Sequence, residues 1–192
     1  MKRPPWDLQF MRLAYVTAER GSCLRKKVGA LIVRDRDKRV ISSGYNGAPR
    51  GMPDCLEVGC DVRVIDGRGS CVRTLHAESN ALDLCGPLSE PHTIYTTVIP
   101  CRNCALRIIQ HGIARVVYHE FYESQGTKEV ADIFNGCDPG TIAQEQVLGS
   151  GPRLQLSAHA AAVLACSRRV EMIHLIEPMD RVKAAWPEAT PK

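Results

Sequence analysis

The order of apolar and polar residues along this chain predicts a helix and then a β-hairpin in its first quarter. After Asp7, which suits the N-cap of a helix, apolar residues recur at helical spacing until Gly21 offers a stop. Two runs with strand-like composition follow at 28–34 and 39–46, and the charged turn "DRDK" separates them. Two such runs around a short polar turn are typical of an antiparallel hairpin.

The later part of the chain alternates between helical and strand patterns. Helices are expected at about 75–85, 102–111, 127–134 and 157–168, and strands are expected at 93–98, 113–119 and 170–176. Because strands that alternate with helices usually pair in parallel through right-handed crossovers, the later strands should run parallel to one another. The pattern therefore predicts an α/β fold with a mixed sheet.

Two segments show neither the helical nor the strand-like spacing of apolar residues. Residues 47–74 are rich in Gly, Pro and Cys, and such a long irregular stretch is usually functional or held by something other than a core. Residues 178–192 contain three prolines and little periodicity, so they are expected to form a poorly ordered tail. The chain has 192 residues, and residues 1–177 are expected to form a single domain.

Composition narrows the class of protein. Hydrophobic residues make up 44% of the chain and charged residues 24%, which excludes disorder or a coiled coil as a description of the whole. The formal net charge of +4 is too small to indicate nucleic-acid binding. The basic run at 25–27 favours either a phosphate contact or a solvated basic face.

The chain also lacks the patterns of a membrane protein. The opening "MKRPPWD" leads into no signal-peptide core, and no apolar run reaches the ~20 residues that a membrane span needs. No membrane partner and a cytoplasmic location are therefore expected.

Two cysteines in the stretch "VIPCRNCALRI" could form a disulfide, act as a redox pair or bind a metal ion. Cys101 and Cys104 follow a proline and open an expected helix, in a chain with nine cysteines. A reducing cytosol argues against a structural disulfide and favours a redox pair or metal ligands. His76 and Glu78 open the preceding helix, and helices that follow strands place their N-termini around one crevice of an open α/β sheet.

One imidazole and two thiolates form a ligand set that suits zinc, and three protein ligands leave the fourth tetrahedral position to water. The sequence therefore predicts a catalytic zinc site made of His76, Cys101 and Cys104. Glu78 lies two residues beyond His76, where it can reach that water without binding the metal and act as general acid and base. A purely structural zinc is the alternative, and it leaves Glu78 without a role.

The pattern H-x-E followed by P-C-x-x-C resembles that of zinc-dependent cytidine and adenosine deaminases. Three further stretches, "CLRKKVGALIV", "GYNGAPRGMPDC" and "VRTLHAESNAL", are similar to the deoxycytidylate (dCMP) deaminase branch, and the resemblance covers roughly residues 8–122. It implies a three-layer α/β/α cytidine-deaminase-like fold with a mixed five-stranded sheet, an antiparallel first hairpin and parallel later strands. It also implies a homo-oligomer, either a hexamer or a dimer, and a deoxynucleoside triphosphate effector.

The resemblance further implies a set of substrate contacts. Asn46 matches an asparagine that contacts the nucleotide sugar, and Tyr122 matches a tyrosine near the base pocket. Ala77, Lys27 and Arg25 are also expected to contact the substrate. Two of these residues have a simpler interpretation, because an Asn-Gly pair readily forms a tight turn and a tyrosine at a strand end can cap the core.

Four other cysteines lie in or near the irregular segment. Cys55, Cys60 and Cys71 lie within it, and Cys23 precedes the first strand. Four thiolates make a closed structural zinc site, and the resemblance supports one because some relatives have a second zinc in this region. Scattered buried thiols are the alternative. The isolated cysteines, expected to be small buried hydrophobes, are Cys85, Cys137 and Cys166.

The reaction implied by the resemblance is zinc-dependent hydrolysis of dCMP, a small cytosine nucleotide, to dUMP and ammonia. The chain departs from the family after Tyr122, where residues 123–156 are expected to be an insertion beside the base pocket. Because pocket walls decide which cytosine compound enters, another cytosine nucleotide or nucleoside stays open as the substrate. The aromatic content of 5% disfavours an RNA- or single-stranded-DNA-editing deaminase, and the intact Glu78 disfavours a zinc scaffold without catalysis.

Overall fold

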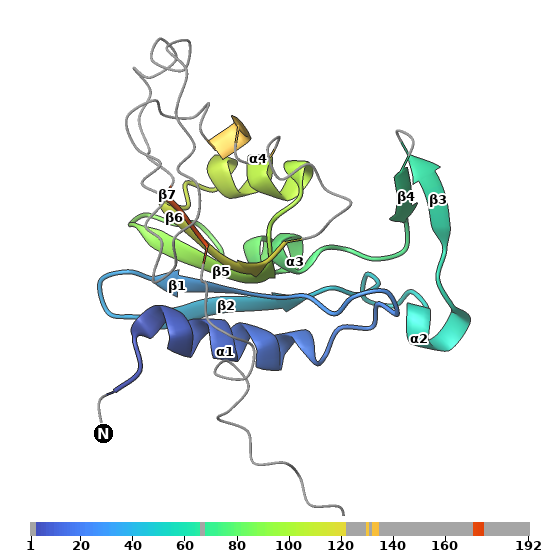
Figure 1. Cartoon of the computed structure of the whole chain (residues 1–192), viewed down its shortest axis with the longest axis horizontal. Helices are drawn as coiled ribbons and strands as arrows, with labels where there is room; N and C mark the ends of the chain where they lie inside the picture. Colours follow the sequence, from blue (N-terminus) through green and yellow to red (C-terminus); the bar gives the residue numbers. More distant parts are fainter. Residues whose placement is uncertain (1–2, 66–67, 122–129, 131, 135–170, 175–192) are drawn as a thin grey trace, which may run out of the picture.

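Among the residues that the structure describes, five strands form a mixed sheet that carries helices on both faces (Figure 1). The computed structural model describes residues 3–65, 68–121, 130, 132–134 and 171–174. In chain order the elements are α1 (Trp6–Ala18), β1 (Gly29–Arg34), β2 (Arg39–Tyr45), α2 (Cys55–Val58), β3 (Val62–Ile65), β4 (Arg68–Cys71), α3 (Ala77–Leu84), β5 (His92–Val98), α4 (Arg102–Gln110), β6 (Arg115–Glu120) and β7 (Glu171–His174).

The strand order in the main sheet is β2-β1-β5-β6-β7. β1 pairs antiparallel with both β2 and β5, and Ala30 lies opposite Thr96 in the second pair. β5, β6 and β7 pair in parallel, with Thr93 opposite Arg115. These pairings confirm the predicted antiparallel hairpin and parallel later strands. They also bring the carboxyl ends of β5 and β6 to one edge of the sheet.

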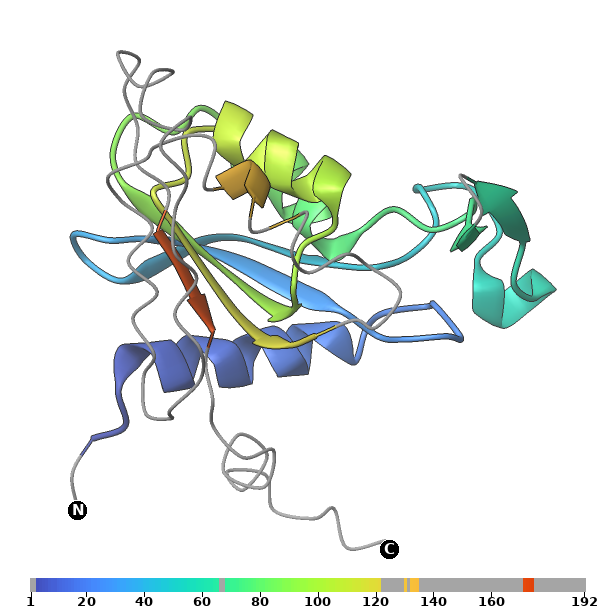
Figure 2. The same ribbon diagram turned by 45° about the horizontal axis from the view of Figure 1, so that its top comes forward.

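α1 lies across one face of the sheet, and α3 and α4 cover the other face (Figure 2). Met11 and Ala14 of α1 are completely buried in a core that includes Leu31 and Val117 of the sheet. The core on the opposite face includes Ala30, Ile32, Ala81, Leu82, Ile94, Ala105, Ile108 and Val116. Neighbouring residues of one strand thus point to opposite faces, and the predicted three-layer α/β/α fold is confirmed.

Two glycines allow helices to approach the hairpin closely. A Cβ atom on Gly29 would lie 2.0 Å from the carbonyl oxygen of Ala14 in α1. A Cβ atom on Gly44 would lie 2.2 Å from the carbonyl oxygen of Ala77 in α3. Because any side chain at Gly44 would push α3 away, this glycine fixes the start of α3 against the end of β2.

Asp7 is not the N-cap residue of α1, so that prediction was wrong. Pro5 holds the N-cap position, and Asp7 lies in the first turn. The Asp7 carboxylate accepts hydrogen bonds from the Tyr95 hydroxyl (2.7 Å) and from both terminal nitrogens of Arg115 (2.8 and 2.6 Å). Burial raises the pKa of Asp7, but these contacts outweigh burial and hold the pKa below its ordinary value. The carboxylate thus ties α1 to β5 and β6.

The segment 47–74, expected to be irregular, contains a short helix and a second hairpin. The Asp54 carboxylate caps α2 by accepting hydrogen bonds from the N–H groups of Leu56 (2.8 Å) and Glu57 (3.1 Å). The Glu57 side chain in turn accepts a hydrogen bond from the Asp54 N–H (3.1 Å), which completes a capping box. β3 and β4 pair antiparallel. Together α2, β3 and β4, which we name the arm, project from one end of the main sheet (Figure 2).

Several expectations concern residues outside the described part of the chain: most of the insertion at 123–156, the helix near 157–168, the tail at 178–192, Tyr122, Cys137 and Cys166. The division into a domain at 1–177 and a tail stays a prediction. Residues 130 and 132–134 are helical, in agreement with the helix expected at 127–134, and β7 confirms the last strand. No helix in the described ranges has the length and apolar character needed to cross a bilayer.

Candidate active site

The predicted zinc ligands lie at the N-termini of α3 and α4. His76 is the N-cap residue of α3, Cys101 is the N-cap residue of α4, and Cys104 lies in the first turn of α4. β5 ends shortly before Cys101, and an isolated bridge between Gly47 and Leu75 holds the chain that enters α3 beside the end of β2. The close approach of α3 at Gly44 and the path from β5 therefore bring the two helix starts to one edge of the sheet.

The three side chains converge on one point. The Nδ1 atom of His76 lies 3.4 Å from the Sγ atom of Cys101 and 3.4 Å from that of Cys104. All three ligand atoms lie within 4.8 Å of one another. Tetrahedral zinc, with bonds of ~2.3 Å to sulfur and ~2.0–2.1 Å to nitrogen, separates such atoms by roughly 3.5 Å. The residues therefore fit a zinc ion, with Nδ1 as the imidazole ligand.

The thiols of this site are free and share their protons unequally. Cys101 and Cys104 form no disulfide. Hydrogen bonding with Cys104, and secondarily with His76, lowers the pKa of Cys101 to about 4, whereas hydrogen bonding with Cys101 raises the pKa of Cys104. The hydrogen bond with Cys101 also raises the pKa of His76 to about 9, so the imidazole must release a proton when its Nδ1 atom binds zinc. The site thus presents a thiolate, the form of cysteine that binds a metal ion.

Glu78 lies in the first turn of α3, with only 4% of its surface exposed. Burial raises the pKa of its carboxyl, and the nearby imidazole of His76 offsets this increase only in part. Glu78 is not one of the converging metal ligands. A buried carboxyl with a raised pKa, beside a metal site but outside its ligand set, is suited to taking up and releasing a proton.

Asn46 follows β2 and is buried. Its Oδ1 accepts a hydrogen bond from the Val28 N–H (2.8 Å), and its Nδ2 donates to the Lys26 carbonyl oxygen (2.7 Å). Gly47 pairs with Leu75 in the isolated bridge, so the Asn-Gly pair does not form the tight turn of the simpler interpretation. A primary amide keeps one N–H and one lone pair after these two contacts. The sugar contact of Asn46 stays a prediction that this geometry permits.

The other expected substrate contacts lie around the loop between α1 and β1 and at the start of α3. Arg25 donates a hydrogen bond to the Gly69 carbonyl oxygen in β4 (2.9 Å), and Lys27 donates to the Glu19 carbonyl oxygen after α1 (3.0 Å). Ala77 is completely buried at the start of α3. The binding roles of Arg25, Lys27 and Ala77 stay predictions.

A second group of thiols lies at the base of the arm. The sulfur atoms of Cys55, Cys60 and Cys71 lie within 4.8 Å of one another. Cys23 is buried and is not part of this group of three. Burial raises the pKa of Cys71, but hydrogen bonds, first among them one with Thr74, outweigh burial and lower the pKa to about 7. These three thiols can hold a metal ion, and the interpretation as scattered thiols does not describe them.

Glu120 was not singled out in the sequence. It ends β6, where its carboxylate forms an ion pair with Lys26 and accepts a hydrogen bond from the Tyr15 hydroxyl. A charged residue directly after an apolar strand, in the strand–helix alternation that contains the P-C-x-x-C motif, is the signal that could have identified it.

Comparison with known proteins agrees with this geometry. Residues 4–120 match the family model described as the cytidine and deoxycytidylate deaminase zinc-binding region. The deoxycytidylate deaminase of Saccharomyces cerevisiae is 42% identical over 127 residues, which cover 64% of this chain and 40% of the yeast protein. The deoxycytidylate deaminase of Mycobacterium phage D29 is 42% identical over 132 residues, which cover 62% of this chain and 97% of the phage protein.

A solved structure is similar in fold. The dCMP deaminase from cyanophage S-TIM5, in complex with dCMP and dUMP, has a TM-score of 0.54 and 28% sequence identity, and the match covers 69% of this chain and 95% of that protein. The chain spans about two fifths of the length of the yeast relative. The family model, however, covers more than half of this chain and includes both cysteine clusters and Glu78. The chain therefore belongs to the cytidine and deoxycytidylate deaminase zinc-binding family.

Proposed function

We propose that this chain is a zinc-dependent deaminase that converts dCMP into dUMP and ammonia. The observation that carries the proposal is the convergence of His76, Cys101 and Cys104, with the buried Glu78 in the adjoining turn. Three protein ligands leave one position of a tetrahedral zinc ion for water, which distinguishes a catalytic zinc site from a closed structural one.

The residues of the site have two roles in the proposed reaction: three of them bind the metal ion, and Glu78 transfers protons. His76, Cys101 and Cys104 would hold the zinc ion, which would supply the Lewis acidity that makes water a nucleophile at neutral pH. Glu78 would take one proton from the water that attacks the ring carbon carrying the exocyclic amine, and would pass this proton to the ring nitrogen. Glu78 then moves the second proton to the departing amine, so that ammonia leaves and a carbonyl group remains. The raised pKa of Glu78 supports this double role.

The choice of dCMP rests on the relatives. The yeast and phage relatives are deoxycytidylate deaminases, and the similar solved structure contains dCMP and dUMP, which differ only where the amine is replaced by a carbonyl oxygen. The residues proposed to contact the nucleotide are Arg25, Lys27, Asn46, Ala77 and Tyr122.

The experiment is a parallel measurement of ammonia release from dCMP, deoxycytidine, CMP and a short cytosine oligonucleotide. We expect dCMP to give the highest kcat/KM. Turnover of the oligonucleotide alone would replace the proposal with a nucleic-acid-editing deaminase. Turnover of deoxycytidine in preference to dCMP would replace the nucleotide with the nucleoside.

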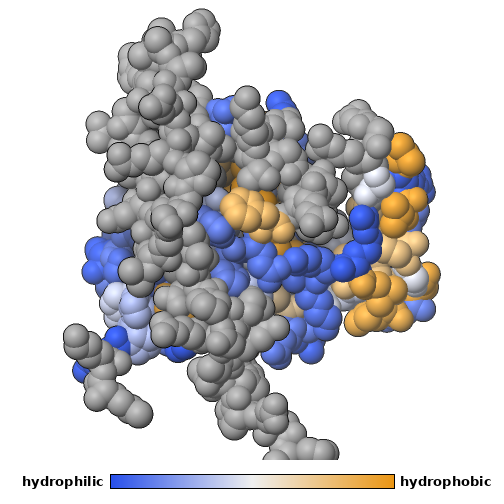
Figure 3. Space-filling view, viewed as in Figure 1, coloured by the Kyte–Doolittle hydropathy of each residue, from blue (hydrophilic) through white to orange (hydrophobic). Residues whose placement is uncertain are grey.

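We also propose a second, structural zinc ion at Cys55, Cys60 and Cys71, with Cys23 as the candidate fourth ligand. The arm has little core of its own, because Leu56, Val62 and Val64 are 61%, 49% and 78% exposed. Figure 3 shows apolar surface gathered over the arm. A metal–thiolate cluster supplies the cross-link that a buried core would otherwise provide.

Metal analysis tests the second site. The purified chain should contain about two zinc ions, and Cys60→Ser should contain about one. Cys85→Ser is the matched control, because Cys85 is a free thiol outside both clusters and its loss should leave the zinc content unchanged. About one zinc ion in the unmodified chain would remove the second site.

Assembly and regulation belong to the same proposal. The resemblance to dCMP deaminases supports a homo-oligomer, a hexamer or a dimer, and a deoxynucleoside triphosphate effector. The free thiols of both clusters suit a reducing compartment and support the expected cytoplasmic location. Light scattering with and without dCTP, alongside the ammonia assay, tests the first two statements.

A further inference from the structure

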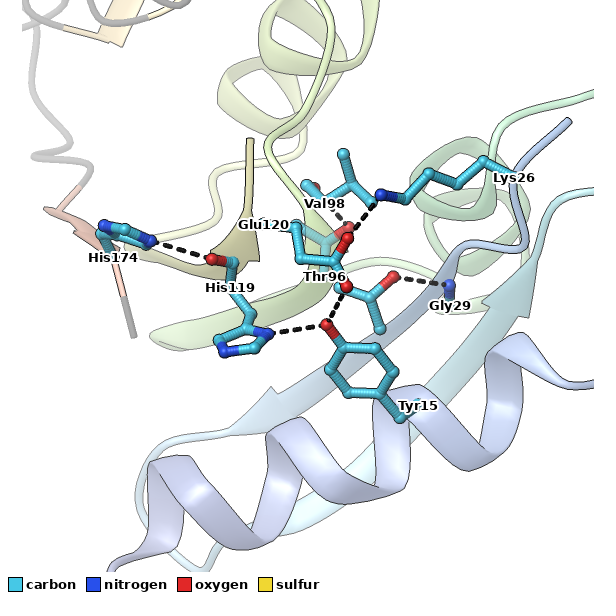
Figure 4. A network of polar contacts seen from close by, with 9 residues as sticks. Tyr15, Lys26, Gly29, Thr96, Val98, His119, Glu120 and His174 are labelled. Carbon is cyan, nitrogen blue, oxygen red and sulfur yellow. Dashed lines mark hydrogen bonds and ion pairs between the residues drawn. The ribbon is translucent and has the colours of Figure 1, made fainter. Parts of the chain in front are cut away.

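A chain of polar contacts crosses the edge of the sheet where β5 and β6 end (Figure 4). The Glu120 carboxylate accepts a hydrogen bond from the Tyr15 hydroxyl (2.6 Å) and forms an ion pair with the Lys26 ammonium. Tyr15 comes from α1, and Lys26 comes from the loop between α1 and β1. The Nδ1 atom of His119 lies 2.6 Å from the Tyr15 hydroxyl. α1 and the loop that follows it thus both contact one carboxylate from far along the chain.

The number of protons gives this chain of contacts a direction. A hydroxyl has one proton, and that of Tyr15 goes to Glu120, because an ionised carboxylate can only accept. His119 then donates its own Nδ1 proton to the Tyr15 oxygen. Burial raises the pKa of Glu120, but hydrogen bonds from Lys26 and Tyr15 outweigh burial and keep the pKa below its ordinary value. Glu120 is therefore charged at neutral pH, and its pair with Lys26 is ionic.

Glu120 lies beside the strand that leads to the metal ligands. It is opposite Val98 in the pairing of β5 with β6, and its carbonyl oxygen accepts a hydrogen bond from the Ile99 N–H (2.8 Å). Cys101 follows Ile99 by two residues. The backbone of Glu120 is therefore held at the end of β5, the strand that leads to Cys101.

Lys26 joins this strand end to the predicted sugar contact. While its ammonium pairs with Glu120, its carbonyl oxygen accepts the hydrogen bond from Nδ2 of Asn46. The N–H of Ser22 donates to the Asn46 carbonyl oxygen (3.1 Å), so Asn46 holds the loop 22–28 near both of its ends. Glu120 then sets where this loop lies relative to β5.

A structural role alone does not account for the arrangement. The ion pair of Asp7 with Arg115 already ties α1 to β6, at the opposite end of that strand. The Lys26 and Glu120 side chains are 33% and 29% exposed, and ion pairs with this much exposure contribute little to stability. Glu120 differs from Asp7 in its position, because it lies between the end of β5, which leads to Cys101, and the loop 22–28, which Asn46 holds.

We propose that Glu120 is a positioning residue of the active site, and that it acts with Tyr15 and Lys26 to hold the loop 22–28 and Asn46 against the bound nucleotide. The inference rests on the proposed deaminase function, because it assigns this loop to the wall of the substrate site. Glu120 acts through Lys26 and takes no part in the chemical step. Its loss therefore weakens substrate binding and leaves the metal centre intact.

The test is steady-state deamination of dCMP by the full chain and by Glu120→Gln, which keeps the shape of the side chain and removes its charge. We expect the KM for dCMP to rise about tenfold and kcat to change less than about twofold. Tyr15→Phe removes one hydroxyl and should raise the KM about threefold. Zinc content should stay the same in both variants, because both residues lie outside the metal ligand sets.

Asp7→Asn is the matched control, since Asp7 also ties α1 to β6 but lies at the other end of the strand. It should lower Tm and leave the KM unchanged. Lys26→Arg keeps the positive charge and should leave the KM close to that of the unmodified chain, whereas Lys26→Met removes the charge and should raise the KM.

An unchanged KM in Glu120→Gln, or an equal rise in Asp7→Asn, would overturn the positioning role while the deaminase function stands. Absence of ammonia release by the unmodified chain would overturn the proposed function and this inference together.

Discussion

The Glu78 carboxyl combines two properties that acid–base catalysis requires. It is buried, which raises its pKa, and it lies in the first turn of α3, next to His76 but outside the metal ligand set. A carboxyl in this environment can hold a transferred proton between two steps of a reaction without exchanging it with bulk solvent.

Replacing Glu78 with Gln keeps the size of the side chain and removes its ability to take up a proton. We expect kcat for dCMP to fall ~10²–10⁴-fold, while the zinc content stays that of the unmodified chain. Ammonia release and metal analysis on the same preparation measure both quantities. Glu19→Gln, at an exposed position after α1, is the control and should keep full activity. Undiminished turnover in E78Q would mean that another group moves the proton.

Asp7 makes part of the stability depend on pH. Its pKa in the folded chain lies below the ordinary value of 3.8 because of Arg115 and Tyr95, despite the opposing effect of burial. The contribution of Asp7 to the free energy of unfolding is therefore fully present above about pH 5 and is lost as the pH falls through the lowered pKa.

Asp7→Asn should accordingly lower Tm at neutral pH, and the difference in Tm from the unmodified chain should shrink as the pH falls below about 4. Thermal unfolding followed by circular dichroism over this range measures the difference. A difference that is the same at about pH 7 and about pH 2 would show that the charge of Asp7 is not what stabilises the fold.

Single residues differ in how far the sequence reveals them. His76, Glu78 and the two cysteines stand at short spacings beside helix starts, so the local pattern alone nominates them as one site. The partners of Asn46 and Glu120 are distant: Val28 is 18 residues from Asn46, and Tyr15 is 105 residues from Glu120. Only the tertiary fold brings these partners together, so no spacing in the sequence could indicate the contacts of Asn46 and Glu120, although sequence patterns can nominate the two residues themselves.

At the scale of elements, the helices and strands that have a buried face lie where the spacing of apolar residues predicts them. The short, exposed elements were not predicted. β5 and α4 lie within one residue of their expected bounds. The elements of the arm have four residues each and expose Val62 and Val64, so no apolar period marks them. The N-cap prediction at Asp7 failed for another reason, since Tyr95 and Arg115 bind its carboxylate from far along the chain.

Gly44 determines the position of a whole element, α3. A methyl group at Gly44 would lie 2.2 Å from the Ala77 carbonyl oxygen and 2.5 Å from the Ala81 nitrogen, so the helix that begins after His76 must shift. We expect Gly44→Ala to lower the free energy of unfolding by about 1–3 kcal/mol and to weaken zinc binding. Gly29→Ala is the matched control, because its methyl group meets α1 and should lower stability without weakening zinc binding. Equal zinc affinities in chelator competition would contradict this role of Gly44.

At the scale of the whole molecule, the main sheet lies between the helices that hold the candidate active site and α1, which packs against the opposite face. The proposed catalytic groups lie where α3 and α4 begin, on one face and at one edge of the sheet. α1 covers the other face and reaches that edge through the contact of Tyr15 with Glu120 (Figure 1, Figure 4). The arm places a second thiol cluster beyond the end of the same sheet. Residues 4–120, which match the family model, contain both clusters, so the proposed catalysis depends on this part of the chain.

The central claim is that deamination takes place at a zinc ion held by His76, Cys101 and Cys104. The most direct measurement is ammonia release from dCMP by one preparation before chelation, after chelation and after zinc is returned, with Cys101→Ser treated in parallel. We expect activity to disappear on chelation, to return with zinc, and to be absent from Cys101→Ser throughout. Undiminished dCMP turnover by the metal-free chain or by Cys101→Ser would contradict the claim.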